Sequence, residues 1–369
     1  MRLIPPRLDQ GRRAYQAADE HPCNNAMGIL TLGFDVMKCR CGGNHSYSFC
    51  ATQHPRRFSQ DTMQPSALPS DILLFERGWL SSNNVLLLGQ DSTALVDSGY
   101  ATHAPQTLAL VGAALDGRPL DQLLNTHLHS DHCGGNAALQ SRYPALRTAI
   151  PPGLAESVRH WDVDALTYAP TGQTCPQFGF DALLQPGSEA QLGERLWQVH
   201  AAPGHDTHSV VLFEPVARVL LSADALWERG FGVVFPELEG VQAFDAVANT
   251  LDVIEALNPA VVIPGHGPAF ADLAAALSYA RARLQGFVAE PARHLRHGVK
   301  VLLKFKLLEQ QSMEAQALLH WARTTPYFAR IYQQHFAHLD FSRWVDELLD
   351  DLVRVRAAAR VDGVVRNVG

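Results

Sequence analysis

The sequence lacks any long uninterrupted apolar run. Hydrophobic residues make up 47% of its 369 residues, yet no stretch approaches the ~18 apolar residues that a membrane-spanning helix requires. Residues 1–15 carry charges with no apolar segment after them, so we predict that there is no secretory signal. We therefore expect a cytoplasmic protein without a membrane partner.

Positive charge is also scarce. The 30 Lys and Arg residues are outnumbered by 37 Asp and Glu residues, which gives a formal net charge of −7 with neutral histidines. This balance is unusual for a general binder of nucleic acid or anionic membranes. We expect a small-molecule substrate, with nucleic acid disfavoured but open as a partner. One basic run could meet an anionic substrate, although the solvated face of a helix is the commoner case. The run comprises Arg293, Arg296, Lys300, Lys304 and Lys306.

Cysteines paired at zinc-finger spacing are absent. Four of the six cysteines lie in residues 1–68, namely Cys23, Cys39, Cys41 and Cys50, and none of them forms a C-x-x-C pair. A small zinc knot is one interpretation of this segment. The favoured one is a poorly ordered extension translated from an upstream start, with Met63 as the usual first residue. The role of this segment and of its cysteines stays open.

Residues 69–285 alternate between two kinds of pattern. Short runs rich in branched apolar residues, bounded by Gly, Pro, Asp or Asn, are typical of buried strands. Helical patterns lie between them, and two sheets covered by outer helices fit this alternation. The predicted strands cover residues 84–88, 94–96, 210–213, 219–221 and 260–263, and the predicted helices cover residues 136–140, 244–257 and 271–284.

Residues 286–369 are predicted to form a small helical module. Residues 315–321 and 341–355 have apolar side chains at three- and four-residue spacing, which indicates helices. Residues 361–365 could form a short hairpin. Helices that end in a hairpin suggest a winged-helix-like module.

The strongest signal lies in residues 127–132, His-Leu-His-Ser-Asp-His. His127 and His129 are two residues apart, so in extended backbone they face the same way and can reach one metal ion. The chain then turns, which lets Asp131 and His132 address a second site. Without a metal, these crowded imidazoles and this carboxylate would be desolvated with few partners. We therefore predict a metal site here.

Three further candidate ligands each follow an apolar strand. His205 and His266 stand after Pro-Gly turns, and Asp224 ends the run 220–223. A single histidine after a strand is usually a surface or hydrogen-bonded residue. Together with the histidine cluster, however, the three complete a set of seven nitrogen and oxygen ligands at strand ends.

This order of ligands resembles the metallo-β-lactamase superfamily, and within it the glyoxalase II-like hydrolases. The resemblance covers roughly residues 70–285 and implies an α/β fold, a four-layer αββα sandwich. It also implies a role for each ligand. His127, His129 and His205 would hold a first metal ion, Asp131, His132 and His266 would hold a second, and Asp224 would bridge them.

The resemblance assigns two more roles. Asp97 matches an aspartate at a strand end that supports the histidine loop without binding metal, as outer contacts to metal ligands commonly do; a simple turn residue is the alternative. Asp131 and Asp224 are the carboxylates on which catalysis would depend. The basic residues that hold the glutathione carboxylates in glyoxalase II have no match in the C-terminal region.

The predicted chemistry follows from the ions. Two zinc ions ~3.5–4 Å apart can share a water and lower its pKa toward ~7, so that a bridging hydroxide attacks at neutral pH. The same ions polarise a carbonyl or phosphoryl oxygen. We expect two Zn2+ per chain, and iron or manganese also suits the ligand set. The favoured reaction is hydrolysis of an ester, thioester or related acyl substrate. A nuclease acting on RNA phosphodiesters and a mononuclear iron persulfide dioxygenase-like enzyme stay open.

Several side chains near the predicted ligands are candidates for contacting the substrate. Trp227, Phe231 and Phe235 follow Asp224 in a loop that could wall an apolar pocket, although ordinary packing is equally open. Tyr100 is a similar candidate after Asp97. His208 would support the ligands, touch the substrate or serve a structural role. A homodimer also stays open.

Overall fold

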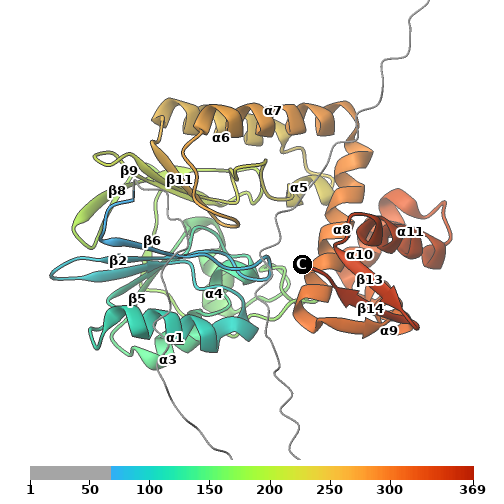
Figure 1. Ribbon diagram of the computed structural model, residues 1–369, viewed down its shortest axis with the longest axis horizontal. Coiled ribbons are helices and arrows are strands. Elements are labelled where there is room, and N and C mark those ends of the chain that lie inside the picture. The colour runs from blue at the N-terminus through green and yellow to red at the C-terminus, as the bar shows by residue number, and fades with distance from the viewer. Residues whose placement is uncertain (1–67) are drawn as a thin grey trace, which may run out of the picture. The chain divides into compact units, whose positions relative to one another are not determined.

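The structure, a computed structural model, describes residues 68–369. The predictions on the N-terminal extension and on Cys23, Cys39, Cys41 and Cys50 lie outside the described residues. Two β-sheets face each other in residues 68–289, and each carries helices on its outer face (Figure 1). Within the described residues, no helix combines the length and the apolar character needed to span a bilayer.

The first sheet has six strands in sequence order, β1 to β6. Strands β1, β2 and β3 pair antiparallel, and β3 to β6 pair parallel. Helices α1 and α3 cover its outer face through a shared cluster of buried aliphatic side chains (Figure 1). The bounds are β1 Ile72–Phe75, β2 Asn84–Leu88, β3 Thr93–Val96, α1 Ala104–Leu115, β4 Gln122–Leu124, α3 Asn136–Arg142, β5 Arg147–Ile150 and β6 Ala182–Leu183.

The second sheet has five strands in the order β11-β10-β9-β8-β7, of which only β10 and β11 pair parallel. Helices α6 and α7 cover its outer face (Figure 1) and enclose a second apolar cluster. The bounds are β7 Glu189–Leu192, β8 Arg195–Ala201, β9 Val210–Glu214, β10 Val219–Ala223, α6 Phe244–Leu257, β11 Val261–Pro264 and α7 Leu273–Ala289.

A third cluster fills the space between the sheets. Trp197 of β8 is fully buried there and packs with aliphatic side chains from both sheets, including Val96 and Ile263. Strands buried on both faces need no polar side, which explains their continuous apolar runs. The predicted four-layer αββα sandwich is confirmed.

Helix α7 begins and ends later than the sequence pattern indicates. The pattern predicts a helix over residues 271–284, whereas the helix runs over Leu273–Ala289. The side chain of Asp272 accepts a 3.0 Å hydrogen bond from the Ala275 N–H and so fixes the start. The helix stops just before Pro291, which opens the next one.

Residues from 290 onward form helices and a small sheet around their own core. Strand β14 lies between β12 and β13, and β13 with β14 forms the predicted hairpin. The fully buried Trp344 lies in this core, which also takes in Val233 and Leu238 of the preceding domain. The bounds are α8 Pro291–Gln310, β12 Ser312–Glu314, α9 Ala315–Thr324, α10 Pro326–Ile331, a π-helix (η3) Tyr332–Phe336, α11 Phe341–Arg354, β13 Ala358–Val361 and β14 Val364–Asn367.

Short helices complete the loops at one edge of the sandwich. They follow strands β3, β4, β5 and β10 along the chain, and two of these strands, β4 and β10, also lead into candidate ligands. Their bounds are η1 Ala101–His103, α2 Ser130–Cys133, η2 Pro152–Leu154, α4 Ala155–His160 and α5 Phe235–Leu238.

Candidate metal centre

The seven candidate ligands converge where strands of both sheets end. The histidine loop follows β4, and the other three ligands follow β8, β10 and β11. Within each of two groups, one ligand atom per residue lies within 4.8 Å of all the others. The first group is His127, His129 and His205, and the second is Asp131, His132, Asp224 and His266.

The first group consists of three imidazoles around one point. His129 Nδ1 lies 3.0 Å from His127 Nε2 and 2.8 Å from His205 Nε2. Burial lowers the pKa of all three rings, and it lowers that of His129 and His205 to about 4. The rings are therefore neutral at pH 7, which is the form that ligates a metal ion.

The outer contacts of two of these rings fix where their protons lie. His205 Nδ1 donates a 2.6 Å hydrogen bond to the Val233 carbonyl, so its Nε2 carries a lone pair. His127 Nδ1 lies 3.2 Å from Thr126 Oγ1, which itself donates to Asp97, so the Nε2 of His127 also carries a lone pair. The Nε2 lone pairs of His127 and His205 thus both point at His129 Nδ1. A divalent cation between the three nitrogens would suit this arrangement.

The second group contains two carboxylates and two imidazoles. His266 Nε2 lies 3.2 Å from Asp131 Oδ2, and His132 Nε2 lies 3.9 Å from the same oxygen. Burial opposes ionisation of Asp131 and Asp224, but the histidines hold the pKa of both carboxyls below the usual value. Both are therefore ionised at neutral pH and can serve as ligands.

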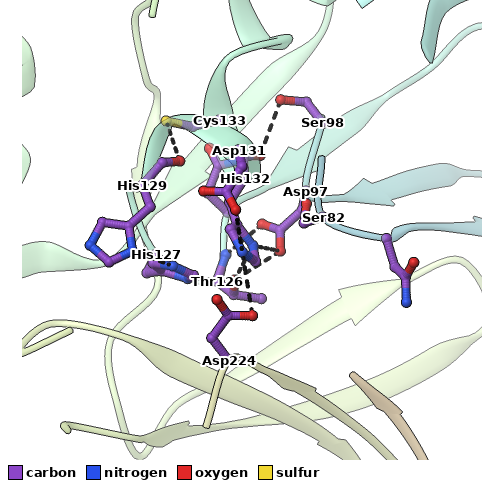
Figure 2. Close-up of polar contacts among 12 residues, drawn as sticks. Ser82, Asp97, Ser98, Thr126, His127, His129, Asp131, His132, Cys133 and Asp224 are labelled. Carbon is purple, nitrogen blue, oxygen red and sulfur yellow. Dashed lines mark hydrogen bonds and ion pairs between the residues drawn. The ribbon is translucent and has the colours of Figure 1, made fainter. Parts of the chain in front are cut away.

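Asp97 orients His132 from outside this group. Its Oδ2 lies 2.8 Å from His132 Nδ1, and its Oδ1 accepts from the Thr126 N–H at 2.9 Å (Figure 2). His132 Nδ1 is therefore a donor, and its buried Nε2 has no hydrogen-bond partner in the described residues. Burial lowers the pKa of this ring, but the neighbouring carboxylates outweigh burial and raise the pKa above its usual value, so Nε2 favours a bound cation, either a proton or a metal ion. An unpartnered buried nitrogen facing carboxylates is costly unless a cation lies between them.

Asp224 lies between the two groups. Its Oδ2 is 3.3 Å from His205 Nε2 in the first group, and its Oδ1 is 3.6 Å from His132 Nε2 in the second. Figure 2 shows this carboxylate opposite the histidine loop. The geometry suits a ligand shared by two ions.

Two glycines let the backbone pass close to these ligands. A Cβ at Gly265 would collide with Asp224 Oδ1 and lie 3.0 Å from His132 Cε1. A Cβ at Gly232 would collide with the ring of His205. Both positions therefore require glycine for steric reasons, whatever their backbone angles.

The remaining candidates from the sequence fall into two sets. Phe235 and His208 line a cavity beside the first group, and Trp227 touches Asp224. Tyr100 and Phe231 are instead buried in the interior. The Tyr100 hydroxyl is engaged with Glu309 and Thr174, and Phe231 packs on Phe287, so the structure does not bring these two to the metal centre.

Two further side chains, absent from the predicted site, lie close to the ligands. The Trp79 ring stacks on His266 with centroids 5.3 Å apart. Asp206 Oδ2 lies 4.0 Å from His129 Nε2, on the side of the ring opposite its Nδ1. Asp206 directly follows His205, and that adjacency was an available signal. Trp79 lies far from every ligand in sequence, and nothing in its surroundings marks it.

These layers and ligand groups define an αββα sandwich with two adjoining groups of histidine and aspartate side chains that could hold metal. The family model of the metallo-beta-lactamase superfamily matches residues 77–266, just over half of the chain. The chain belongs to this superfamily.

Among curated proteins, the hydroxyacylglutathione hydrolase of Stenotrophomonas maltophilia is 34% identical over 151 residues, which cover 41% of this chain and 48% of that protein. The Beta-lactamase-like protein 2 homolog of Drosophila melanogaster is 30% identical over 195 residues, which cover 51% of this chain and 59% of that protein. The chain thus spans about half the length of the curated relatives it matches. A beta-lactamase domain protein from Burkholderia ambifaria shares the fold, with a TM-score of 0.51 and 21% identity over 84% of this chain and 97% of that one.

Proposed function

We propose that this chain is a metal-dependent hydrolase that acts on an ester, thioester or related acyl substrate with two metal ions, preferably zinc. The observation that carries the proposal is the convergence of seven donor residues whose lone pairs and carboxylates face one another in two adjoining groups. Several curated relatives are named hydroxyacylglutathione hydrolase, which supports an acyl substrate. Zinc is the usual choice for imidazole and carboxylate ligands in this arrangement.

Bound divalent ions supply Lewis acidity and make a water molecule nucleophilic at neutral pH. The chain's own residues hold and orient this chemistry. His127, His129 and His205 would form one ligand set, and Asp224 would join it to the other. Asp97 holds a proton on Nδ1 of His132, so Nε2 is the nitrogen that would ligate a metal ion, which would displace the Nε2 proton.

Asp131 and Asp224 are the carboxylates we propose for catalysis. Both are held ionised by neighbouring histidines, so either can accept a proton from the attacking water. The Asp131 side chain is 15% exposed and that of Asp224 is 6% exposed. We therefore propose that Asp131, the more accessible of the two, passes the proton to solvent.

Metal analysis and one substitution test the proposal. We expect the purified protein to hold about two ions per chain. The variant His129→Ala should lose turnover, with its circular dichroism spectrum unchanged, because one nitrogen of the first group is gone. The variant His160→Ala, at a histidine whose side chain is 80% exposed on α4, is the matched control and should keep activity. Full activity in His129→Ala would overturn the assignment.

A substrate screen separates the acyl reaction from the two alternatives. Zinc-loaded protein should hydrolyse acyl thioesters or lactones and leave short RNA intact. Iron-loaded protein with glutathione persulfide should consume no oxygen. RNA cleavage or oxygen uptake in the absence of acyl hydrolysis would replace the proposal with the corresponding alternative.

A further inference from the structure

Two cysteine side chains meet beside the histidine loop. Cys133 is the last residue of α2, and Cys175 lies in the segment 173–180, which contains neither helix nor strand. Both are free thiols, and their sulfur atoms are 3.8 Å apart although 42 positions separate them in the sequence. They are the only cysteines in residues 68–369, the range that the structure describes. The fold therefore places these two thiols in contact.

The two thiols differ in their access to solvent. Cys133 is fully buried, whereas Cys175 is half-buried. A small oxidant therefore reaches the sulfur of Cys175 first. Cysteines that respond to oxidants are often accessible and lie next to a second thiol that closes a disulfide with them. Cys133 is in the position of this second thiol.

Cys133 is tied to the metal ligands through a single helical turn. Its sulfur lies 3.2 Å from the His129 carbonyl oxygen (Figure 2), and its backbone N–H donates to the same oxygen at 3.1 Å. The turn α2 also contains Asp131 and His132, two members of the second ligand group. Because buried segments are closely packed and transmit strain, a displacement of Cys133 is passed on to these ligands.

The segment that carries Cys175 is held from two sides. The hydroxyl of Ser130 donates a 2.5 Å hydrogen bond to Gln173 Oε1. The Thr174 N–H donates to the Tyr100 hydroxyl at 3.0 Å, and this hydroxyl donates to Glu309 of α8 at 2.7 Å.

These contacts limit how far the segment can move toward Cys133. In a disulfide, the present sulfur–sulfur distance of 3.8 Å would have to shorten to ~2.05 Å. Since the segment of Cys175 is held in place, part of this movement falls on Cys133 and therefore on the histidine loop.

We propose that Cys133 and Cys175 form a redox modification site, in which oxidation by a hydroperoxide to a disulfide displaces the histidine loop and weakens metal binding. The inference goes beyond the proposed function, because hydrolysis uses neither thiol. It makes the metal centre responsive to oxidants.

The oxidation takes place in two steps, written here for hydrogen peroxide. The sulfur of Cys175 attacks one peroxide oxygen, so an S–O bond forms and the O–O bond breaks, and the thiol proton leaves with the second oxygen as water. The sulfur of Cys133 then attacks the sulfur of this sulfenic acid. An S–S bond forms, the S–O bond breaks, and the hydroxide leaves as water with the Cys133 proton. Two thiols thus give two electrons to one peroxide, which becomes two water molecules.

Peptide mapping by mass spectrometry tests the bridge in the full chain. After treatment with hydrogen peroxide, we expect the peptides of Cys133 and Cys175 to be joined and lighter by two hydrogen atoms than their sum. A phosphine reductant should separate them again. Recovery of Cys175 as a sulfinic acid or bound to another cysteine, with Cys133 unmodified, would overturn the proposal.

Competition with a chromogenic chelator tests the effect on metal binding. We expect peroxide to lower the apparent zinc affinity about tenfold or more, since disturbed contacts around metal ligands typically cost 10–100-fold, and the phosphine should restore it. Cys175→Ser keeps Cys133 and cannot form the bridge, so peroxide should leave its zinc affinity unchanged. Both proteins carry four further serine substitutions, which remove other thiols that could bind zinc or react. These replace Cys23, Cys39, Cys41 and Cys50.

Two results of the competition would count against the proposal. They are a complete bridge with unchanged zinc affinity and an equal loss of affinity in Cys175→Ser.

These measurements use no substrate, so they separate this proposal from the proposed function. If the bridge forms and zinc binding weakens, but the reduced protein cleaves no acyl substrate, the hydrolase assignment is wrong and the redox site stands. If acyl substrates are cleaved and peroxide does not join Cys133 to Cys175, the hydrolase assignment stands and the redox site is wrong.

Discussion

The indole Nε1 of Trp227 donates a 3.2 Å hydrogen bond to Oδ1 of Asp224. The same oxygen faces His132 Nε2 at 3.6 Å and His266 Nε2 at 3.9 Å. The ring of Trp79 packs edge-on against Trp227, with centroids 5.3 Å apart, and stacks on His266. One indole therefore orients the carboxylate that joins the two ligand groups, and a second indole covers the histidine beside it.

Replacing Trp227 by Phe tests this orientation. The substitution keeps an aromatic ring and removes the only donor that the indole offers to Asp224. Loss of such an outer contact typically costs 10–100-fold in metal affinity. We expect the second ion to be lost first when the variant is titrated with a competing chelator. Trp344→Phe is the matched control, because its Nε1 has no partner in the described residues. Equal retention of both ions in Trp227→Phe would contradict the role.

Asp97 offers a second test of the outer contacts. Its two oxygens accept from the Thr126 N–H, the Thr126 hydroxyl and His132 Nδ1. In Asp97→Asn one of these oxygens becomes an NH2 group that faces a donor. We expect the metal-free protein to lose about 1–3 kcal/mol of unfolding free energy, together with weaker metal binding. Urea unfolding with and without zinc measures both effects. Asp91→Asn, at an exposed turn, should change neither.

The ligand set was predictable from sequence because each member ends a strand of recognisable pattern. Each strand determines where the chain reaches the edge of the sheet, so the position of a histidine or aspartate directly after the strand is also determined. His205, Asp224 and His266 each follow a buried strand, and the structure brings all three to the histidine loop.

The walls around the ligands were less predictable, since they depend on contacts between distant segments. Phe231 and Phe235 belong to the same loop, yet Phe231 packs inward on Phe287 while Phe235 faces His129. No local pattern separates these two positions. Tyr327 reaches the cavity from α10, and only the tertiary packing of the C-terminal helices places it there.

Gly265 tests how closely the backbone must approach the ligands. A methyl group at this position would collide with Asp224 Oδ1 and crowd His132. We expect Gly265→Ala to displace Asp224 and to lower both metal content and kcat about tenfold or more, because positioning errors near ~1 Å cost ~100-fold in well-oriented sites. Gly179→Ala is the control, since a Cβ there meets nothing within 4 Å. Metal analysis and kinetics are compared between the two variants. Similar metal content and kcat in both would show that the backbone at Gly265 does not need to lie so close to the ligands.

His294 should make the stability of the fold depend on pH. Its ring is buried, Nε2 accepts a 3.1 Å hydrogen bond from the Val234 N–H, and burial lowers its pKa to about 4. Below the ordinary value of 6.5, the unfolded chain takes up a proton that the folded chain refuses. Stability from this residue is therefore complete above pH 6.5 and falls as the pH drops toward 4.

The variant His294→Gln isolates that contribution, since glutamine keeps an acceptor for Val234 and does not titrate. Between pH 6.5 and pH 4, the wild type should lose up to about 3 kcal/mol more unfolding free energy than the variant does, because each unit of pKa shift corresponds to about 1.4 kcal/mol. Urea unfolding of metal-free protein across this range measures the difference, and removing the metal keeps the ligand histidines equal in both proteins. His160→Gln, at an exposed side chain, should follow the wild type. If the unfolding free energy of His294→Gln changes with pH as steeply as that of the wild type, the ring takes up its proton in the folded state. The Val234 hydrogen bond then does not hold the ring neutral.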